Sequence, residues 1–109
     1  MRTSPGRCPD IPKGSAHVLF LAHMEVTVPA GLDPAVVADL LAREKARAVE
    51  LQREGCWREL WRVAGRFANV SVFEVGSVDR LHEILASLPM FPYLDITVTA
   101  LATHPSKVD

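Results

Sequence analysis

The stretch that decides the fold is DPAVVADLLAREKARAVELQREG, residues 33–55. It has the pattern of one amphipathic helix: Asp33 can cap the first turn, Pro34 suits the first helical position, and Gly55 can end the helix. With about 100° of rotation per residue, the apolar positions fall on one face. These positions are Val37, Leu40, Leu41, Ala48 and Leu51. Glu44 lies near the centre of that face, so the predicted helix carries a carboxylate on its apolar side.

A glutamate on an apolar face needs an explanation, because a buried charge is costly unless it is paired or functional. One interpretation is a structural ion pair between Glu44 and an arginine of a neighbouring strand. The other is a general base whose pKa is raised by desolvation. Periodicity alone favours the ion pair, because structural ion pairs are common, and it leaves both interpretations open.

The rest of the chain predicts four strands and a second helix. The strands are expected at Val18–Val28, Trp57–Ala64, Phe67–Val75 and Leu94–Ala102, and the helix at Val78–Leu88. Ser77 is a suitable N-cap for that helix, and Pro89 ends it. The order β-α-β-β-α-β predicts an α+β fold of the ferredoxin-like type, a four-stranded antiparallel sheet with two helices on one face.

The two middle strands form a predicted hairpin whose turn is centred on Gly65-Arg66. In that register Arg62 faces Asn69, and Leu60 faces Ser71, all on one side of the hairpin. The other side carries Trp61, Val63, Val70 and Val72. The sequence leaves open which of the two sides packs against the helices.

The polar residues of the hairpin have two interpretations each. Arg62, on a strand expected to be central or nearly so, could pair with Glu44 or Glu25, or its guanidinium could bind the carboxylate of a ligand. Asn69 and Ser71 could face solvent, which the sequence alone favours, or they could donate hydrogen bonds to a developing oxyanion.

Composition narrows the class of protein. The 109 residues are enough for one domain, and a net charge of −1 gives no electrostatic footprint for nucleic acid. No apolar run is long enough for a membrane span. The strand face with Leu19, Leu21, Thr97 and Thr99 is expected to lie open on the sheet, which predicts an oligomer.

The cysteines and the N-terminal stretch indicate no functional site. Cys8 and Cys56 are far apart in the sequence and form no C-x-x-C, so they indicate neither a zinc site nor a redox motif. Cys56 is expected to be a packed thiol, and the compartment the cytoplasm. Proline and glycine interrupt residues 1–17, which we expect to be a flexible extension before a domain at 18–109.

The sequence offers less evidence for a functional role of the histidines and tryptophans. The histidines show no metal-ligand spacing, so no metal site is predicted. His104, next to Pro105 near the C-terminus, could cap a pocket of its own or of a neighbouring subunit, or could be an exposed tail residue. Trp57 and Trp61 are expected to serve the core or an interface.

Several segments resemble those of the muconolactone delta-isomerase family. The similar segments are AREK at 42–45, LQREG at 51–55, WRELWRVAG at 57–65, ANVSVF at 68–73, LPMFPYLD at 88–95 and HPS at 104–106. The likeness runs from about residue 18 to residue 106, and the first 17 residues are an addition to the family's pattern. His23 is a departure, because the family usually has lysine or arginine there.

The resemblance implies a function. Members of the family are ferredoxin-like, assemble into large rings, typically decamers, and convert muconolactone to 3-oxoadipate enol-lactone in the β-ketoadipate pathway of aromatic catabolism. They use no metal or organic cofactor. The resemblance implies that Glu44 is the base, and that Arg62, Arg58 and Lys45 are candidates to hold the substrate's carboxylate. Asn69, Ser71 and His104 complete the expected substrate-binding set.

Two alternatives remain open at this stage. The same scaffold could serve a chloromuconolactone dehalogenase, in which the same proton abstraction ends in loss of chloride. The chain could also be a non-catalytic ligand-binding member of the dimeric α/β-barrel group, with Glu44 only an ion-pair partner. Assays with both lactones would separate the first alternative from the isomerase.

Overall fold

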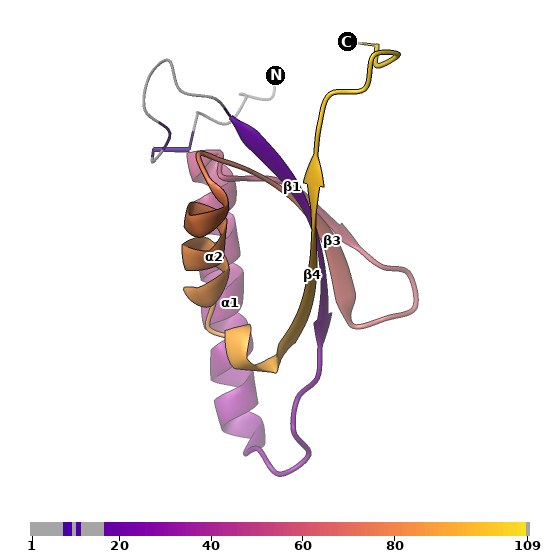
Figure 1. Ribbon diagram of the computed structural model, residues 1–109. Helices are drawn as coiled ribbons and strands as arrows, with labels where there is room; N and C mark the ends of the chain where they lie inside the picture. Colours follow the sequence, from indigo (N-terminus) through magenta and orange to yellow (C-terminus); the bar gives the residue numbers. More distant parts are fainter. Residues whose placement is uncertain (1–7, 10, 12–16, 109) are drawn as a thin grey trace, which may run out of the picture.

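A computed structural model describes residues 8, 9, 11 and 17–108 of the chain. Its antiparallel sheet has the strand order β2-β3-β1-β4, and both helices lie on one face of the sheet (Figure 1). The elements are β1 (Val18–Val26), α1 (Pro34–Glu54), β2 (Trp57–Arg62), β3 (Ala68–Val75), α2 (Val78–Ala86), a short 3-10 helix η1 (Phe91–Tyr93) and β4 (Leu94–Leu101). The predicted ferredoxin-like βαββαβ fold is therefore confirmed. The expectation that Arg62 lies on a central strand is wrong, because β2 is an edge strand.

Helix α1 has the ends that its sequence predicts. The side chain of Asp33 accepts a hydrogen bond from the backbone N–H of Ala35 at 2.8 Å, and Pro34 follows it. At the other end Gly55 has a φ of 89°, the left-handed conformation that glycine adopts without a Cβ clash. The backbone N–H of Cys56 then donates to the carbonyl of Leu51. These local bonds fix where the helix ends and β2 begins.

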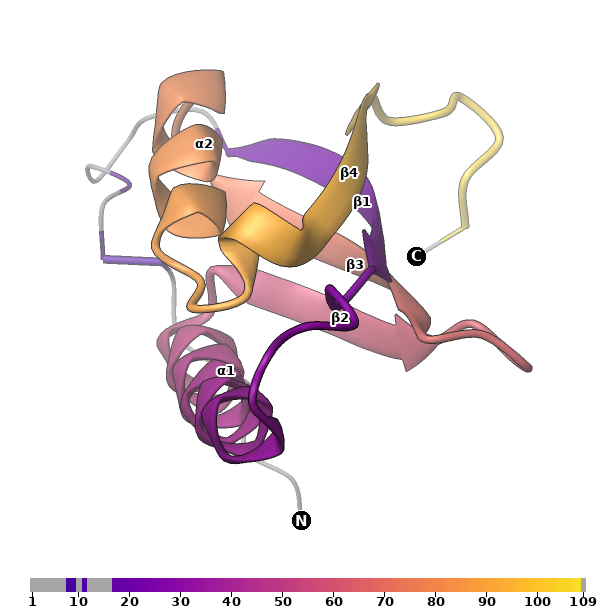
Figure 2. The same cartoon turned by 90° about the horizontal axis from the view of Figure 1, so that it is seen from below.

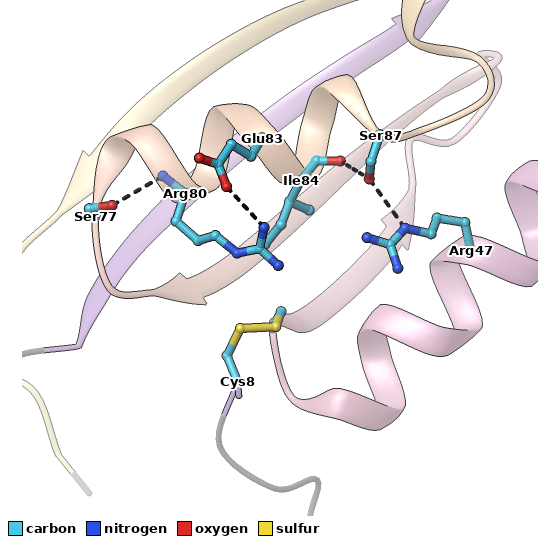
Figure 3. A network of polar contacts seen from close by, with 8 residues as sticks. Cys8, Arg47, Ser77, Arg80, Glu83, Ile84 and Ser87 are labelled. Carbon is cyan, nitrogen blue, oxygen red and sulfur yellow. Dashed lines mark hydrogen bonds and ion pairs between the residues drawn. A yellow bond between two sulfur atoms is a disulfide. The ribbon is translucent and has the colours of Figure 1, made fainter. Parts of the chain in front are cut away.

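Helix α2 covers the other part of the same sheet face. Its apolar stripe is buried, with Leu81, Ile84 and Leu85 inside the helix and Leu88 just after its end. Ser77 caps its first turn by accepting a hydrogen bond from the backbone N–H of Arg80. Figure 3 shows how the two helices are linked: Arg47 of α1 donates to the hydroxyl of Ser87, which donates to the carbonyl of Ile84.

The pairing register decides which face of the sheet meets the helices. Arg62 pairs with Asn69 and Leu60 with Ser71, as the predicted turn requires. In the next pair of strands Ala22 lies opposite Ser71. Ala22 and Ser71 are both fully buried under the helices. The face that carries Arg62, Asn69 and Ser71 is therefore the inner one.

A bulge changes the start of β2. The register shifts between Trp57 and Glu59, so Arg58 is an extra residue. Strict alternation would place Trp57 on the outer face with Glu59 and Trp61. Instead its ring packs on Phe73, with centroids 4.8 Å apart, and only 3% of it is exposed. Trp57 therefore belongs to the core, whereas Trp61 is 65% exposed.

The described part of the N-terminal stretch corrects two expectations. Cys8 forms a disulfide with Cys56, so Cys56 is not the packed thiol that we expected. Cys8 and Ile11 are buried in the core cluster with residues such as Ile84, so their exclusion from the fold is wrong. No local pattern indicates this disulfide, because the pairing of distant cysteines depends on the tertiary fold. We also expected residues 1–17 to be flexible, but most of these residues lie outside the described ones.

The outer face of the sheet is open within the single chain, as predicted. Leu19 is 38% exposed and Leu101 39%, and the threonines at 97 and 99 are also exposed. In the first half of α1, Leu41 of the predicted stripe remains exposed, whereas Ala48 and Leu51, nearer the end of the helix, are buried. Figure 2, seen from below, shows α1 standing apart from α2 at this end.

Neither helix of the described chain combines the length and hydropathy that crossing a bilayer requires.

Candidate active site

A cavity of about 490 Å³ lies between α1 and the inner face of the sheet. Its position is set by strand ends: Val26 at the end of β1, Arg62 at the end of β2, Ala68 at the start of β3 and Leu94 at the start of β4 all line it. Most of the wall is apolar, with a few polar groups, which is the usual composition of a small-molecule site. The polar side chains are those of Glu44, Lys45, Gln52, Arg62 and Asn69.

Glu44 lies on the α1 side of this cavity. Its carboxylate accepts one hydrogen bond, from the backbone N–H of Met90 at 2.9 Å, in the segment between α2 and β4. Burial raises the pKa of Glu44 above its ordinary value of 4.5, and the Met90 hydrogen bond partly opposes that shift. No ion pair of Glu44 exists within the described part of the chain, so the structural ion-pair interpretation is not supported.

Two cations share the cavity with this carboxylate. Lys45 and Arg62 both line it, both are exposed, and neither is paired with a carboxylate of the described chain. The guanidinium carbon of Arg62 lies 5.5 Å from the centroid of the Phe67 ring, a cation–π contact that supports its position at the rim. The unpaired side chains of Lys45 and Arg62 can therefore bind an anionic group of a ligand at this opening.

Asn69 and Ser71 lie on β3, two residues apart and on the inner face. Asn69 lines the cavity, whereas Ser71 is fully buried behind it and does not. The hydroxyl of Ser71 donates to the side-chain oxygen of Asn69 at 2.7 Å. The prediction that these residues merely face solvent is wrong, because the face that carries them packs against α1.

Two of the predicted substrate-binding residues lie elsewhere. Arg58, the extra residue of the bulge, is bonded to Glu74 at 2.9 Å and does not line the cavity. His104 follows β4 in the exposed C-terminal segment, where its Nδ1 accepts a hydrogen bond from the backbone N–H of Ser106. In Figure 1 this segment extends away from the two helices. Within one chain, neither residue can contact a ligand in the cavity.

The sequence interpretation missed three contributors. Gln52 lines the cavity, with its amide nitrogen donating to the carbonyl of Ala48. Its spacing of eight residues from Glu44 places it on the same helix face, a signal that was available. Trp57 forms part of the wall because of the bulge, and the backbone N–H of Met90 comes from a distant connection. Neither of these had a signal in the sequence.

The described residues contain no group of three or more histidine, cysteine, aspartate or glutamate side chains able to hold a metal ion.

A comparison with known protein families matches the part of the chain that contains the described helices and strands. The family profile described as muconolactone delta-isomerase matches residues 18–107. This chain belongs to the muconolactone delta-isomerase family. The match includes every residue named above as lining the cavity, and it leaves out Cys8 and Ile11.

Individual muconolactone delta-isomerases agree with this assignment. The protein of Cupriavidus pinatubonensis is 50% identical over 91 residues, which are 84% of this chain and 99% of that protein. The protein of Pseudomonas putida is 50% identical over 91 residues, 84% of this chain and 95% of the relative. A crystal structure of muconolactone isomerase superposes with a TM-score of 0.80 at 53% identity, covering 84% of this chain and 95% of that one.

Proposed function

We propose that this protein is a cofactor-independent isomerase that converts muconolactone to 3-oxoadipate enol-lactone, with Glu44 as the single base. Family membership and the names of the similar proteins support the reaction. The observation that carries the mechanism is the half-buried carboxylate of Glu44 in a largely apolar cavity that also holds two unpaired cations.

The chemistry requires one proton to move from C4 to C2 of the lactone ring. Glu44 takes the C4 proton, and the electron pair of that C–H bond spreads through the ring to the lactone carbonyl oxygen. The protonated Glu44 then returns the proton to C2, so no group is consumed. A raised pKa suits this exchange, because it brings the proton affinity of the carboxylate closer to that of the carbon acid.

The other residues of the cavity bind the substrate in this proposal. Lys45 and Arg62 attract the carboxylate of the substrate's acetate arm, which a paired arginine such as Arg58 would not do as well. The apolar wall holds the ring and limits the access of water. Asn69 supplies a neutral donor to the carbonyl oxygen.

Turnover of muconolactone tests the proposal. We expect loss of the ultraviolet signal of the substrate when it is mixed with the purified wild-type protein, and turnover slower by at least about 10² with Glu44→Gln. The rate should fall as the pH drops through the pKa of Glu44, which lies above 4.5, because only the ionised carboxylate accepts a proton. Release of chloride from a chloromuconolactone, with no turnover of muconolactone, would instead identify a dehalogenase.

We propose further that the protein is a homo-oligomer larger than a dimer, a decameric ring as the family resemblance implies. The open sheet face with Leu19, Trp61 and Leu101, and the exposed start of α1 with Val36 and Leu41, support this, because such apolar surface usually meets another subunit. Light scattering coupled to size exclusion at micromolar concentration tests it. A monomeric mass would contradict it.

The cytoplasm remains the proposed location, but its original basis has changed. That prediction accompanied the expectation that Cys56 is a packed thiol, and the structure joins Cys56 to Cys8. Disulfides are rare in a reducing cytosol. A cytoplasmic protein should therefore contain both cysteines as thiols in living cells, and rapid alkylation before lysis would detect them. The proposed domain, 18–109, begins where the family match begins, and Cys8 and Ile11 of the preceding stretch pack into its core.

A further inference from the structure

Ser71 is a polar side chain in the core that the proposed function does not explain. It is fully buried, and among the described residues it is the one buried residue with a polar side chain. Its neighbours across the sheet are Ala22 on β1 and Leu60 on β2, which offer no side-chain acceptor. The hydroxyl donates to the side-chain oxygen of Asn69 at 2.7 Å.

This hydrogen bond distinguishes the two ends of the Asn69 amide. The oxygen end faces Ser71, and the amide nitrogen has no hydrogen-bond partner within the described part of the chain. Asn69 itself lines the cavity. If the amide turned over, the buried hydroxyl of Ser71 would lose its acceptor, which is unfavourable in an apolar surrounding. The contact therefore favours one orientation, with the N–H donors directed away from Ser71.

The pairing of β2 with β3 places this donor beside a cation. Asn69 lies directly opposite Arg62, and both side chains line the cavity. Glu44 approaches the same cavity from α1. A ligand with a carboxylate at Arg62 would therefore have its remaining atoms close to a neutral donor and to the base.

We propose that Ser71 is a positioning residue, which holds the Asn69 amide so that its N–H donates to the lactone carbonyl oxygen. This rests on the proposed function and names the oxyanion donor of that same site. Negative charge gathers on this oxygen when the C4–H bond breaks and its proton passes to Glu44. Asn69 donates a hydrogen bond and keeps its proton, and the charge is discharged when Glu44 protonates C2. A donor fixed in advance stabilises that charge without reorganisation.

The sequence allows a direct test that needs no turnover. Asn69 is the single asparagine of the chain and Gln52 the single glutamine, so their side-chain amides give two pairs of signals in a ¹⁵N-correlated NMR spectrum. The probe is 5-oxotetrahydrofuran-2-acetate, a saturated lactone acid that cannot isomerise. Spectra of the wild type and Ser71→Ala are recorded in the folded protein with and without the probe.

We expect the probe to shift the Asn69 amide signals of the wild type, and this response to be lost or strongly reduced in Ser71→Ala. Gln52 also lines the cavity, with its amide held by the carbonyl of Ala48, so a shift of its signals in both proteins shows that the probe still binds in Ser71→Ala. Ser71→Thr keeps the hydroxyl and should keep the response. An Asn69 signal that does not move when the probe binds the wild type overturns the proposal, as does an equal response in Ser71→Ala.

Kinetics separate positioning from a general loss of structure. Removal of one oxyanion donor costs about 10²–10³ in kcat, so we expect Asn69→Ala to lose about 10²-fold. Ser71→Ala should lose about tenfold in kcat with little change in KM, because the amide is still present but no longer held. In the Asn69→Ala background, Ser71→Ala should have no further effect. A full additional tenfold loss in that background would show that Ser71 does not act through Asn69.

The outcomes also separate this inference from the proposed reaction. A wild type that does not turn over muconolactone but shows the Ser71-dependent Asn69 response would refute the reaction and support the lactone contact. A wild type that turns over muconolactone while both variants keep full kcat would support the reaction and refute this inference.

Discussion

The two ends of the layer between the helices and the sheet differ in how they are closed. At the end where α1 finishes, α2 and the segment with Cys8 cover the sheet, and Cys8, Cys56 and Ile84 are completely buried. At the end where α1 begins, α1 and the segment around Met90 leave a cavity over the strand ends, with Glu44 and Arg62 in its wall. The same fold thus puts apolar packing and a disulfide at one end and unpaired charge at the other. Variants of the closed end should change stability, and variants of the cavity should change activity.

The largest expected effect belongs to Glu44→Gln at the cavity. This change keeps the shape and the acceptor for the N–H of Met90 but removes the proton acceptor. Loss of a general base costs about 10²–10⁴ in rate, so kcat should fall by at least about 10². Steady-state kinetics with muconolactone measure it, and the melting temperature should not fall while the oligomer mass stays unchanged. Nearly full kcat in a folded oligomer would show that another residue is the base.

The disulfide at the closed end should give the next largest effect, on stability alone. Cys8 and Cys56 are 48 residues apart, and closing a loop of that length contributes up to about 4 kcal/mol in the chain-entropy model. Cys8→Ser should therefore lower the unfolding free energy by about 2–4 kcal/mol, measured by urea denaturation, while kcat stays the same.

Reduction of the disulfide in the wild type is the control for Cys8→Ser. Dithiothreitol should destabilise the wild type to the level of Cys8→Ser and should not affect the variant. A fall in kcat that matches the fall in stability would mean that the two ends are coupled, because Trp57 follows Cys56 directly and lines the cavity.

The cations of the cavity should have a smaller effect, on substrate binding. Arg62→Met and Lys45→Met each remove one unpaired positive charge from the rim, and we expect KM to rise about tenfold, equivalent to about 1.4 kcal/mol. Arg58→Met is the matched control, because its guanidinium is bonded to Glu74 outside the cavity. A larger rise in KM for Arg58→Met than for Arg62→Met would place the substrate's carboxylate elsewhere.

The smallest expected effect is the pH dependence of stability that Glu44 contributes. Its pKa is raised in the folded protein, so the ionised form is disfavoured by folding, and this cost is present at neutral pH. As the pH falls through the folded-state pKa, Glu44 takes up a proton and the cost disappears. Glu44→Gln should therefore be at least as stable as the wild type at pH 8, with the difference shrinking toward pH 4.5. Urea midpoints across this range measure it, and a variant that is less stable at pH 8 would contradict the direction.

The sequence by itself determined the local elements. Asp33, Pro34 and Gly55 fix the ends of α1, because their capping and backbone preferences act within a few residues. The periodicity of the chain placed Glu44 on the apolar side of α1. The turn at Gly65 set the pairing of Arg62 with Asn69, since a hairpin's register follows from its turn. Because of this helix periodicity and this hairpin register, four of the seven predicted site residues line the cavity: Glu44, Lys45, Arg62 and Asn69.

Only the tertiary structure decided the contacts between distant parts of the chain. It chose the face of the hairpin that packs under α1, because both faces carry apolar residues and local rules do not distinguish them. It placed the N–H of Met90 on Glu44 and joined Cys8 to Cys56, contacts between residues 46 and 48 positions apart. The bulge turned Trp57 inward and left Arg58 with Glu74. Such contacts depend on how whole elements pack, which no short window of sequence contains.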